Sequence, residues 1–235
     1  MLCDQTQRCD TIASSTWNFV KLAVPNVIAN GCMWMIYPVN AYFAGQLKDE
    51  AKLAGIGLAQ TTLYTFMWAF MIGFTIPTST FTSQAFGKGD LRLCGIILNR
   101  GRFIVTTFFC PMAVLLLFSR KILLALGQDA IVVEHAVKYI KLVLPAYYMY
   151  TMFHLSRRWL NSMRLNYVPM TVMVVGIPIN IACNHLFVNV WKMDIEGIAC
   201  AFTCTCFSLL FLITVYTYCI PSISQALFLP TSETW

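Results

Sequence analysis

Asn180, Asn184 and His185 lie in an uncharged stretch between Val168 and Trp191 that is long enough to cross a bilayer as a helix. Asn180 and Asn184 are four residues apart, which predicts that they share one helix face, with His185 directly beside them. Amides at membrane depth either hydrogen-bond neighbouring helices or line a polar pathway, and both interpretations stay open. An imidazole there is either a packed, hydrogen-bonded group or a proton carrier.

A second set of polar residues falls in the apolar segment over residues 18–45. Asn26, Asn30 and Tyr37 follow i, i+4, i+11 spacing, which predicts one helix face that either lines a cavity or packs against other helices. Asn40 follows near the end of the same segment. The predicted substrate or ion cavity therefore consists of Tyr37, Asn40, Asn180, Asn184 and His185.

Proline interrupts five of the six apolar segments, and each proline removes a backbone hydrogen bond that hydrocarbon cannot replace. Pro25 and Pro178 are predicted to be conformational kinks. Broken helices around a polar centre are typical of secondary transporters. The six prolines are Pro25, Pro38, Pro77, Pro111, Pro145 and Pro178.

The composition indicates an all-α, polytopic membrane protein. Of the 235 residues, 58% are hydrophobic and 11% are charged, whereas a soluble domain averages about a quarter charged. Lys and Arg lie between the apolar segments, so the positive charge predicts topology and no nucleic-acid partner. We found no catalytic motif and no metal-ligand spacing: Cys200, Cys204 and Cys206 lie in an apolar helix, where packing is favoured over zinc. We therefore expect neither an enzyme nor a cofactor or metal site.

The predicted organisation is a polar N-terminal tail over residues 1–16, a transmembrane lobe over 17–220 and a tail or linker over 221–235. The lobe should contain six transmembrane helices, at about 18–45, 53–86, 91–119, 130–161, 167–191 and 195–220. If the N-terminus is cytosolic, nine Lys and Arg residues lie on the cytosolic side of the membrane and seven on the other side, which favours this orientation. The membrane is expected to be the plasma membrane or an organelle membrane.

The sequence resembles the multidrug and toxic compound extrusion (MATE) family through several short motifs and the order in which they occur. The resemblance is to the N-terminal six-helix lobe of eukaryotic-like members. The motifs are Leu22-Ala23-Val24-Pro25, Ser83-Gln84-Ala85-Phe86-Gly87, Asn99-Arg100, Leu126-Gly127-Gln128-Asp129, Arg158-Trp159-Leu160 and Asn180 to Val188. Family members have twelve helices in two lobes and exchange H⁺ or Na⁺ for cationic or amphipathic organic molecules. The resemblance implies the N-terminal half of such an antiporter, which would need a second six-helix lobe. The alternative is a non-transporting membrane scaffold or subunit derived from the lobe.

The resemblance also implies a departure from prokaryotic members, which carry ion-binding aspartates in the first and fifth helices. Asn40 and Asn184 stand at the matching positions, and an amide does not titrate and carries no charge. In eukaryotic members the coupling acid is a glutamate of the second lobe. The three asparagines are then expected to line the cavity or to pack helices together.

Overall fold

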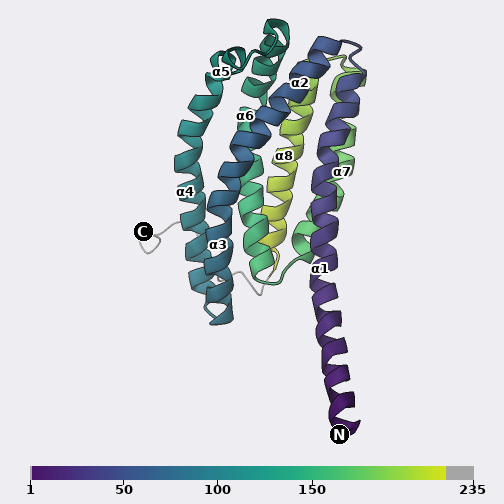
Figure 1. The fold of residues 1–235 in the computed structure, drawn as a ribbon, viewed down its shortest axis with the longest axis vertical. Coiled ribbons are helices and arrows are strands. Elements are labelled where there is room, and N and C mark those ends of the chain that lie inside the picture. The colour runs from purple at the N-terminus through teal and green to yellow at the C-terminus, as the bar shows by residue number, and fades with distance from the viewer. Residues whose placement is uncertain (1, 221–235) are drawn as a thin grey trace.

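A computed structural model describes residues 2–220, which form an all-α bundle of long helices running side by side (Figure 1). The predicted tail or linker over 221–235 lies outside the described residues. The predicted all-α class is confirmed. The elements are α1 (Leu2–Gly45), α2 (Glu50–Leu63), the π-helical segment η1 (Tyr64–Trp68), α3 (Ala69–Gly87), α4 (Leu91–Leu117), α5 (Ser119–Ala125), α6 (Ala130–Ser162), α7 (Tyr167–Asn184), the π-helical segment η2 (His185–Val190) and α8 (Ile195–Tyr218).

These elements form six long segments, because η1 joins α2 to α3 and η2 extends α7 without a break. The first helix begins earlier than expected, at Leu2, since neither glycine nor proline occurs before Pro25 to stop it. Four stretches within the described residues are long and apolar enough to span a membrane: Phe19–Gly45, Leu91–Leu117, Tyr167–Val190 and Ile195–Tyr218.

α6 is the most enclosed helix, and its position explains its more polar composition. It packs against α2, α3, α4 and α8, and every residue from Tyr150 to Arg157 is buried. A helix surrounded by protein needs no continuous apolar surface for lipid, so α6 can hold His154 and Arg157 in its interior half.

Aspartate is the N-cap residue of three helices. Asp49, Asp90 and Asp129 cap α2, α4 and α6, and each side chain accepts a hydrogen bond from a backbone N–H of the first turn. Gly89 and Gly127 adopt positive φ in the turns before α4 and α6.

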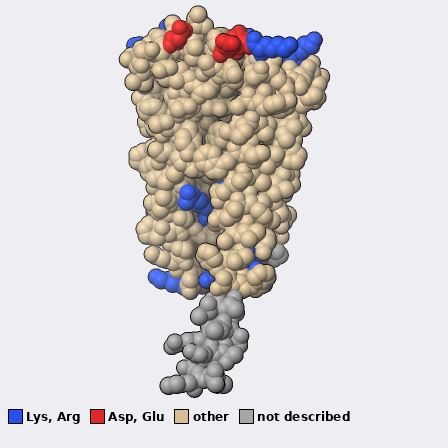
Figure 2. Space-filling model, turned by 45° about the vertical axis from the view of Figure 1, so that its right-hand side comes forward, with Lys and Arg blue, Asp and Glu red and all other residues tan. Residues whose placement is uncertain are grey.

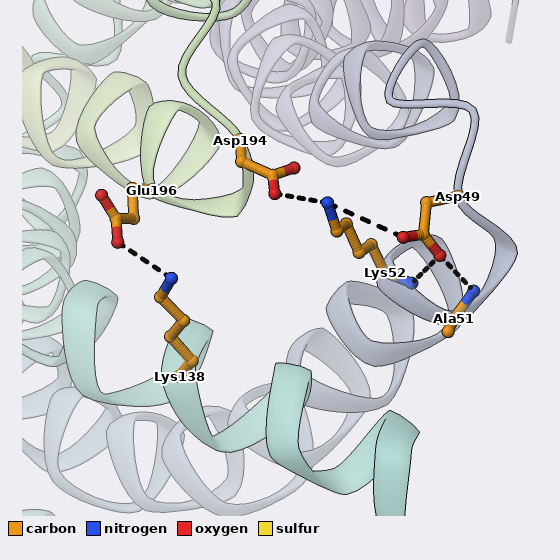
Figure 3. Close-up of polar contacts among 6 residues, drawn as sticks. All are labelled: Asp49, Ala51, Lys52, Lys138, Asp194 and Glu196. Atoms are coloured by element: carbon orange, nitrogen blue, oxygen red, sulfur yellow. Dashed lines mark hydrogen bonds and ion pairs between the residues drawn. The ribbon is translucent and has the colours of Figure 1, made fainter.

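Ion pairs at the α1–α2 loop end tie the start of α8 to two neighbouring helices (Figure 3). Lys52 of α2 pairs with Asp194, directly before α8, and lies 3.7 Å from Asp49; Lys138 of α6 lies 2.9 Å from Glu196. The hydrogen bond that Lys52 Nζ donates to the Asp194 carboxylate raises the pKa of Lys52. Because these groups lie at the end of the bundle and range from partly to fully exposed, we expect them to orient the helices more than to stabilise them.

The lateral surface suits a bilayer. Figure 2 shows a body between the two ends of the bundle that is uncharged apart from one basic patch, with the acidic groups on this face gathered at one end. Large apolar side chains cover the flanks, including Phe19, Val27, Phe81, Phe207 and Phe211. The chain is an integral, multi-pass membrane protein.

The helix contact between α2 and α6 predicts a contrast between two nearby glycines. A Cβ at Gly55 would lie 2.6 Å from His135 Cβ and 3.1 Å from the Val132 carbonyl oxygen, whereas a Cβ at Gly57 would meet nothing within 4 Å. Gly55→Ala should therefore lower the thermal unfolding temperature of the purified chain, because backbone atoms of α6 would have to move. Gly57→Ala, the matched control, should leave it unchanged or raise it, since alanine favours helix. Equal effects of the two substitutions would contradict this account of the α2–α6 contact.

Candidate functional site

The structure brings three of the five predicted site residues together in one buried amide cluster, formed by Asn40 of α1 and Asn180 and Asn184 of α7. All three side chains are at most 1% exposed. Asn184 Nδ2 donates to Asn40 Oδ1 at 2.9 Å, and Asn180 Nδ2 donates to the same oxygen at 3.3 Å. A single acceptor on α1 therefore receives two donors from successive turns of α7.

A third helix, α8, contributes to the amide cluster through Thr205. Asn180 Nδ2 also donates to Thr205 Oγ1 at 3.0 Å, and this hydroxyl donates to the Ala201 carbonyl at 2.8 Å. Asn184 Nδ2 donates in addition to the backbone carbonyl of Asn180 at 2.9 Å. The amide cluster thus links α1, α7 and α8 where all three are buried.

The chemistry of the amide cluster is hydrogen bonding without proton storage. Asn40 Nδ2, Asn180 Oδ1 and Asn184 Oδ1 are buried and have no partner among the described residues. The cluster can therefore donate and accept further hydrogen bonds. Neutral amides do not titrate, so these three residues cannot carry a coupling proton themselves.

His185 lies apart from the amide cluster. It is exposed, and its Nδ1 is 3.0 Å from Nδ2 of Asn189 on the same helical segment. The sequence placed this imidazole beside the amides, but consecutive residues on a helix are turned by about 100° from each other. Asn184 consequently points into the bundle while His185 points outward.

Tyr37 lines a different feature, an aromatic pocket between α1, α2 and η1. Trp34, Tyr37, Gln60, Thr61 and Tyr64 form its walls, and its volume is about 340 Å³. The Trp34 ring lies 6.2 Å from the Tyr37 ring and 5.9 Å from the Tyr64 ring, and Trp34 is 48% exposed. The aromatic pocket is therefore open to the surface of the bundle.

The inner end of the aromatic pocket narrows between rings of η1 and α6. Tyr64 and Trp68 stack at 5.4 Å with an interplanar angle of 15°, and a small cavity of about 10 Å³ behind them is lined in part by Tyr147 and Tyr150. The Trp68 ring meets the buried His154 ring edge-on at 5.9 Å. α6 thus closes the pocket from inside with a layer of aromatic side chains.

The regular backbone hydrogen bonding of both helical segments that form the aromatic pocket is interrupted beside it. Tyr64 and Trp68 belong to a π-helical segment, a feature frequent at functional sites. On α1, Pro38 has no N–H to donate to the carbonyl of Trp34, four residues earlier. The pocket therefore lies where the regular hydrogen-bond ladders of two helices are interrupted.

Asn26 and Asn30 of α1 accept hydrogen bonds from α6. Arg157 donates from Nη2 to Asn30 Oδ1 at 2.6 Å and from Nη1 to Met33 Sδ at 3.2 Å, and Asn161 Nδ2 donates to Asn26 Oδ1 at 3.3 Å. Of the two interpretations of the face that carries Asn26 and Asn30, the structure supports packing. We call these five residues the α1–α6 seam.

The two prolines predicted as kinks lie inside helices that continue past them. Pro25 is buried in α1, and Asn166 Nδ2 donates to the neighbouring Leu22 carbonyl at 2.9 Å. Pro178 is exposed on α7, two residues before Asn180.

Sequence reasoning missed Trp34, Tyr64, Trp68 and Thr205. A local signal existed for three of them, because Trp34 precedes Tyr37 by three residues and Tyr64 precedes Trp68 by four, spacings that put rings on one helix face. Thr205 gave no such signal, since its role depends on how α8 packs against α7.

Substitution of a buried and of an exposed asparagine should have different effects on stability. Asn180→Leu removes two interhelical hydrogen bonds, so we expect it to lower the free energy of unfolding by about 1 kcal/mol, at about 0.6 kcal/mol for each bond. Asn189→Leu, an exposed control on η2, should cost close to nothing. Denaturation of the purified chain in detergent measures both, and equal losses would show that the amide cluster does not stabilise the bundle.

Comparison with known proteins gives the same assignment from sequence and from structure. The MatE family model matches residues 25–186. Multidrug and toxin extrusion protein 1 of Danio rerio is 29% identical over 197 residues, which cover 84% of this chain and 33% of that protein. Protein DETOXIFICATION 34 of Arabidopsis thaliana is 23% identical over 197 residues, covering 83% of this chain and 35% of that protein.

The solved structures share the fold. A crystal structure of a eukaryotic MATE transporter superposes with a TM-score of 0.89 at 19% identity and covers 94% of this chain and 49% of its own. A MATE structure in the bent conformation gives a TM-score of 0.78 at 16% identity, with 92% and 49% coverage. The chain therefore spans about a third of the curated relatives it matches and about half of the solved structures. With more than half of its residues matched by the family model, this chain belongs to the MatE family, which is a family of membrane transporters and not of enzymes.

Proposed function

We propose that the chain forms the N-terminal half of a secondary antiporter that exports organic cations or xenobiotics in exchange for H⁺ or Na⁺. We further propose that the aromatic pocket contacts the substrate. The observation that carries this assignment is an open pocket with indole and phenol rings on three of its walls, in a chain whose family relatives are named for multidrug and toxin extrusion.

The pocket chemistry favours organic cations. Trp34, Tyr37 and Tyr64 present π systems, which attract a cation placed over the ring face, and none of the five lining residues is acidic. Without a carboxylate, the pocket would not hold a strongly hydrated metal ion. A bulky, weakly hydrated cation can exchange its hydration for ring contacts at lower cost, and the polar groups of Gln60 and Thr61 can orient it.

The coupling ion would need a site in the second lobe. The carboxylates on described side chains lie in loops or in the first two turns of helices, such as Asp49, Asp129 and Glu196, and none lies at mid-bundle. Asn40 and Asn184 remain candidates for lining the central cavity of a complete two-lobe transporter. In that arrangement the amide cluster would position α1 and α7 while an acid on the partner lobe binds H⁺ or Na⁺.

We also propose that the α3–α4 turn faces the cytosol. Basic side chains gather at that end, among them Lys88, Arg92, Arg158 and Arg164, whereas the opposite end mixes Lys with most of the described carboxylates. This distribution supports the orientation predicted from Lys and Arg alone.

A single lobe should bind but not transport. Alternating access requires one lobe to rock against another, and this chain supplies one lobe. Proteoliposomes that contain residues 1–235 alone should therefore show no accumulation of an organic cation driven by a pH gradient beyond that of protein-free liposomes. Accumulation that is abolished by a protonophore would contradict the prediction.

Substrate contact by the aromatic pocket predicts a loss of cation affinity in Trp34→Ala. Removing one cation–π partner should weaken tetraphenylphosphonium binding by about two- to thirtyfold, and Trp34→Phe should lie between that variant and the unmodified chain. Equilibrium dialysis of the purified chain measures the affinity. Trp191→Ala, which removes an exposed tryptophan at the far end of η2, is the matched control.

A neutral ligand completes this test. Triphenylphosphine oxide has similar rings and no net charge, so its binding should be weak and should change little in Trp34→Ala. If the unmodified chain binds both ligands equally, or neither, the aromatic pocket is not a cation site. The alternative of a non-transporting scaffold or subunit would then be favoured.

A further inference from the structure

A second concave surface lies between α2, α4 and α5, and we call it the α2–α5 pocket. Its volume is about 340 Å³, and its lining on α2 and η1 runs from Leu58 to Phe66. The end of α4, α5 and the turn after α5 supply the other walls. Thr61 is the one described residue that it shares with the aromatic pocket, so the two are distinct surfaces.

The α2–α5 pocket has a buried floor and an exposed rim. Leu116 and Leu123 are 2% and 3% exposed, whereas Leu126 is 70% exposed. Thr65, on the α2 side, is exposed as well. The pocket is therefore a depression that opens on the lateral surface of the bundle, where a membrane protein contacts lipid.

Ser119 brings a hydroxyl without a hydrogen-bond partner to this lining. The residue is 2% exposed, and its Oγ has no partner among the described residues. It directly follows the break between α4 and α5, where the carbonyl four residues earlier, that of Leu115, accepts the Phe118 N–H at 3.1 Å. A buried hydroxyl that finds no partner costs free energy, so a ligand group that bonds to Ser119 Oγ would remove this cost.

The buried threonines show how unusual the Ser119 hydroxyl is. Within the described part of the chain there are six, and each donates to the carbonyl four residues earlier in its own helix. Helical hydroxyls in this bundle therefore find a partner on their own backbone as a rule. Ser119 departs from that rule at the point where it lines a pocket.

The α2–α5 pocket spans the depth of one leaflet. Arg120 and Lys121, both exposed, follow Ser119 directly and place it at the membrane boundary. At the other end of the lining, Phe66 lies sixteen residues past the exposed Glu50, which is about 24 Å along the helical segment. Half of a bilayer, including its headgroup region, is about 20–22 Å thick. The pocket thus extends from the membrane boundary toward the middle of the bilayer.

The lining favours a neutral ligand with one hydrogen-bonding group. None of the described lining residues is charged, so neither a phosphate nor an ammonium headgroup meets an opposite charge there. The hydroxyls of Thr61, Thr62 and Thr65 already donate to carbonyls of their own helical segment. Ser119 is therefore the lining hydroxyl that remains available to donate.

The apolar walls favour a rigid ligand over a flexible acyl chain. Six of the lining residues are leucine or isoleucine, which offer apolar contact and no further hydrogen bond. With so few polar contacts, the ordering of the ligand on binding weighs heavily in the affinity. A fused ring system has little conformational freedom to lose, whereas an acyl chain loses many rotamers.

We propose that the α2–α5 pocket binds one sterol. The sterol hydroxyl would accept a hydrogen bond from Ser119 Oγ at the membrane boundary. The fused rings would lie along Leu58, Leu116 and Leu123, with the apolar end toward Phe66. This inference depends neither on the proposed substrate nor on the coupling ion.

Photolabelling of the purified full chain tests the proposal. The chain is delipidated in detergent and irradiated with a cholesterol analogue that carries a diazirine on its rings and an alkyne on its side chain. Labelled peptides are identified by mass spectrometry. We expect the label on residues 58–66 and 115–128, and an excess of unlabelled cholesterol should displace it.

Ser119→Ala should act differently with and without sterol. In the delipidated chain it removes an unpartnered buried hydroxyl, so the thermal unfolding temperature should stay the same or rise. Cholesterol affinity should fall about two- to twelvefold, as for the loss of one hydrogen bond. Binding of cholestane, which has the same rings and no oxygen, should not change. Ser208→Ala, a serine of α8 that donates to the Cys204 carbonyl at 2.8 Å, is the control and should affect neither ligand.

A second variant fills the pocket and keeps the hydroxyl. Ile122→Trp places a larger side chain in the lining, at a half-buried position, and should remove most of the labelling. Leu124→Trp is the matched control, because Leu124 belongs to the same helix, is 40% exposed and is not a lining residue. It should leave labelling unchanged.

Several outcomes would overturn the proposal. Absence of label, or displacement of the label by dioleoylglycerol as effectively as by cholesterol, would exclude a sterol site. A lower unfolding temperature of delipidated Ser119→Ala would show that the hydroxyl is bonded within the chain. Labelling that persists in Ile122→Trp would place the sterol elsewhere on the lateral surface.

Discussion

Hydrocarbon offers no hydrogen bonds, so the interior polar groups of this bundle must find partners on neighbouring helices. α1 shows the requirement most clearly, because Pro25 and Pro38 each remove one of its backbone donors. Each proline is followed within five residues by an asparagine bonded to another helix: Asn30 accepts from Arg157 of α6, and Asn40 accepts from α7. Side-chain hydrogen bonds to neighbouring helices thus hold α1 in place, although two of its own backbone hydrogen bonds are missing.

This anchoring is unequal around α1. Its amide contacts join it to α6, α7 and, through Asn180, to α8, whereas its side toward α2 is occupied by aromatic rings and an open pocket. Trp34 is 48% exposed on that side, while Asn40, six residues later, is fully enclosed. The surface available for a ligand therefore lies on the side where no buried amide fixes the helix.

The sequence predicted the all-α class, the long helices and the shared face of Asn180 and Asn184, because each follows from local periodicity. It could not predict that Thr205 joins these amides, since that contact depends on the packing of α8 on α7. His185 was expected to lie with the amides because it is adjacent to Asn184 in the chain. Consecutive helix residues are rotated by about 100° from each other, so His185 points outward. η1 was also beyond prediction, because Tyr64–Trp68 has the composition of an ordinary apolar helix and a π turn has no comparable sequence signal.

η1 has a consequence for how this lobe can vary. A π segment accommodates one residue more than an α-helix of the same rise, and so absorbs the rotation of about 100° that an extra residue would otherwise impose. Deleting a single residue between Tyr64 and Trp68 would therefore restore α-helix there while leaving the orientation of α3 relative to α2 unchanged. Thr78 would stay beside Gly101, whereas the rings of η1 would shift against Trp34. A deletion at this one turn thus changes the aromatic pocket but preserves the contact between α3 and α4, so the pocket can vary independently by this route.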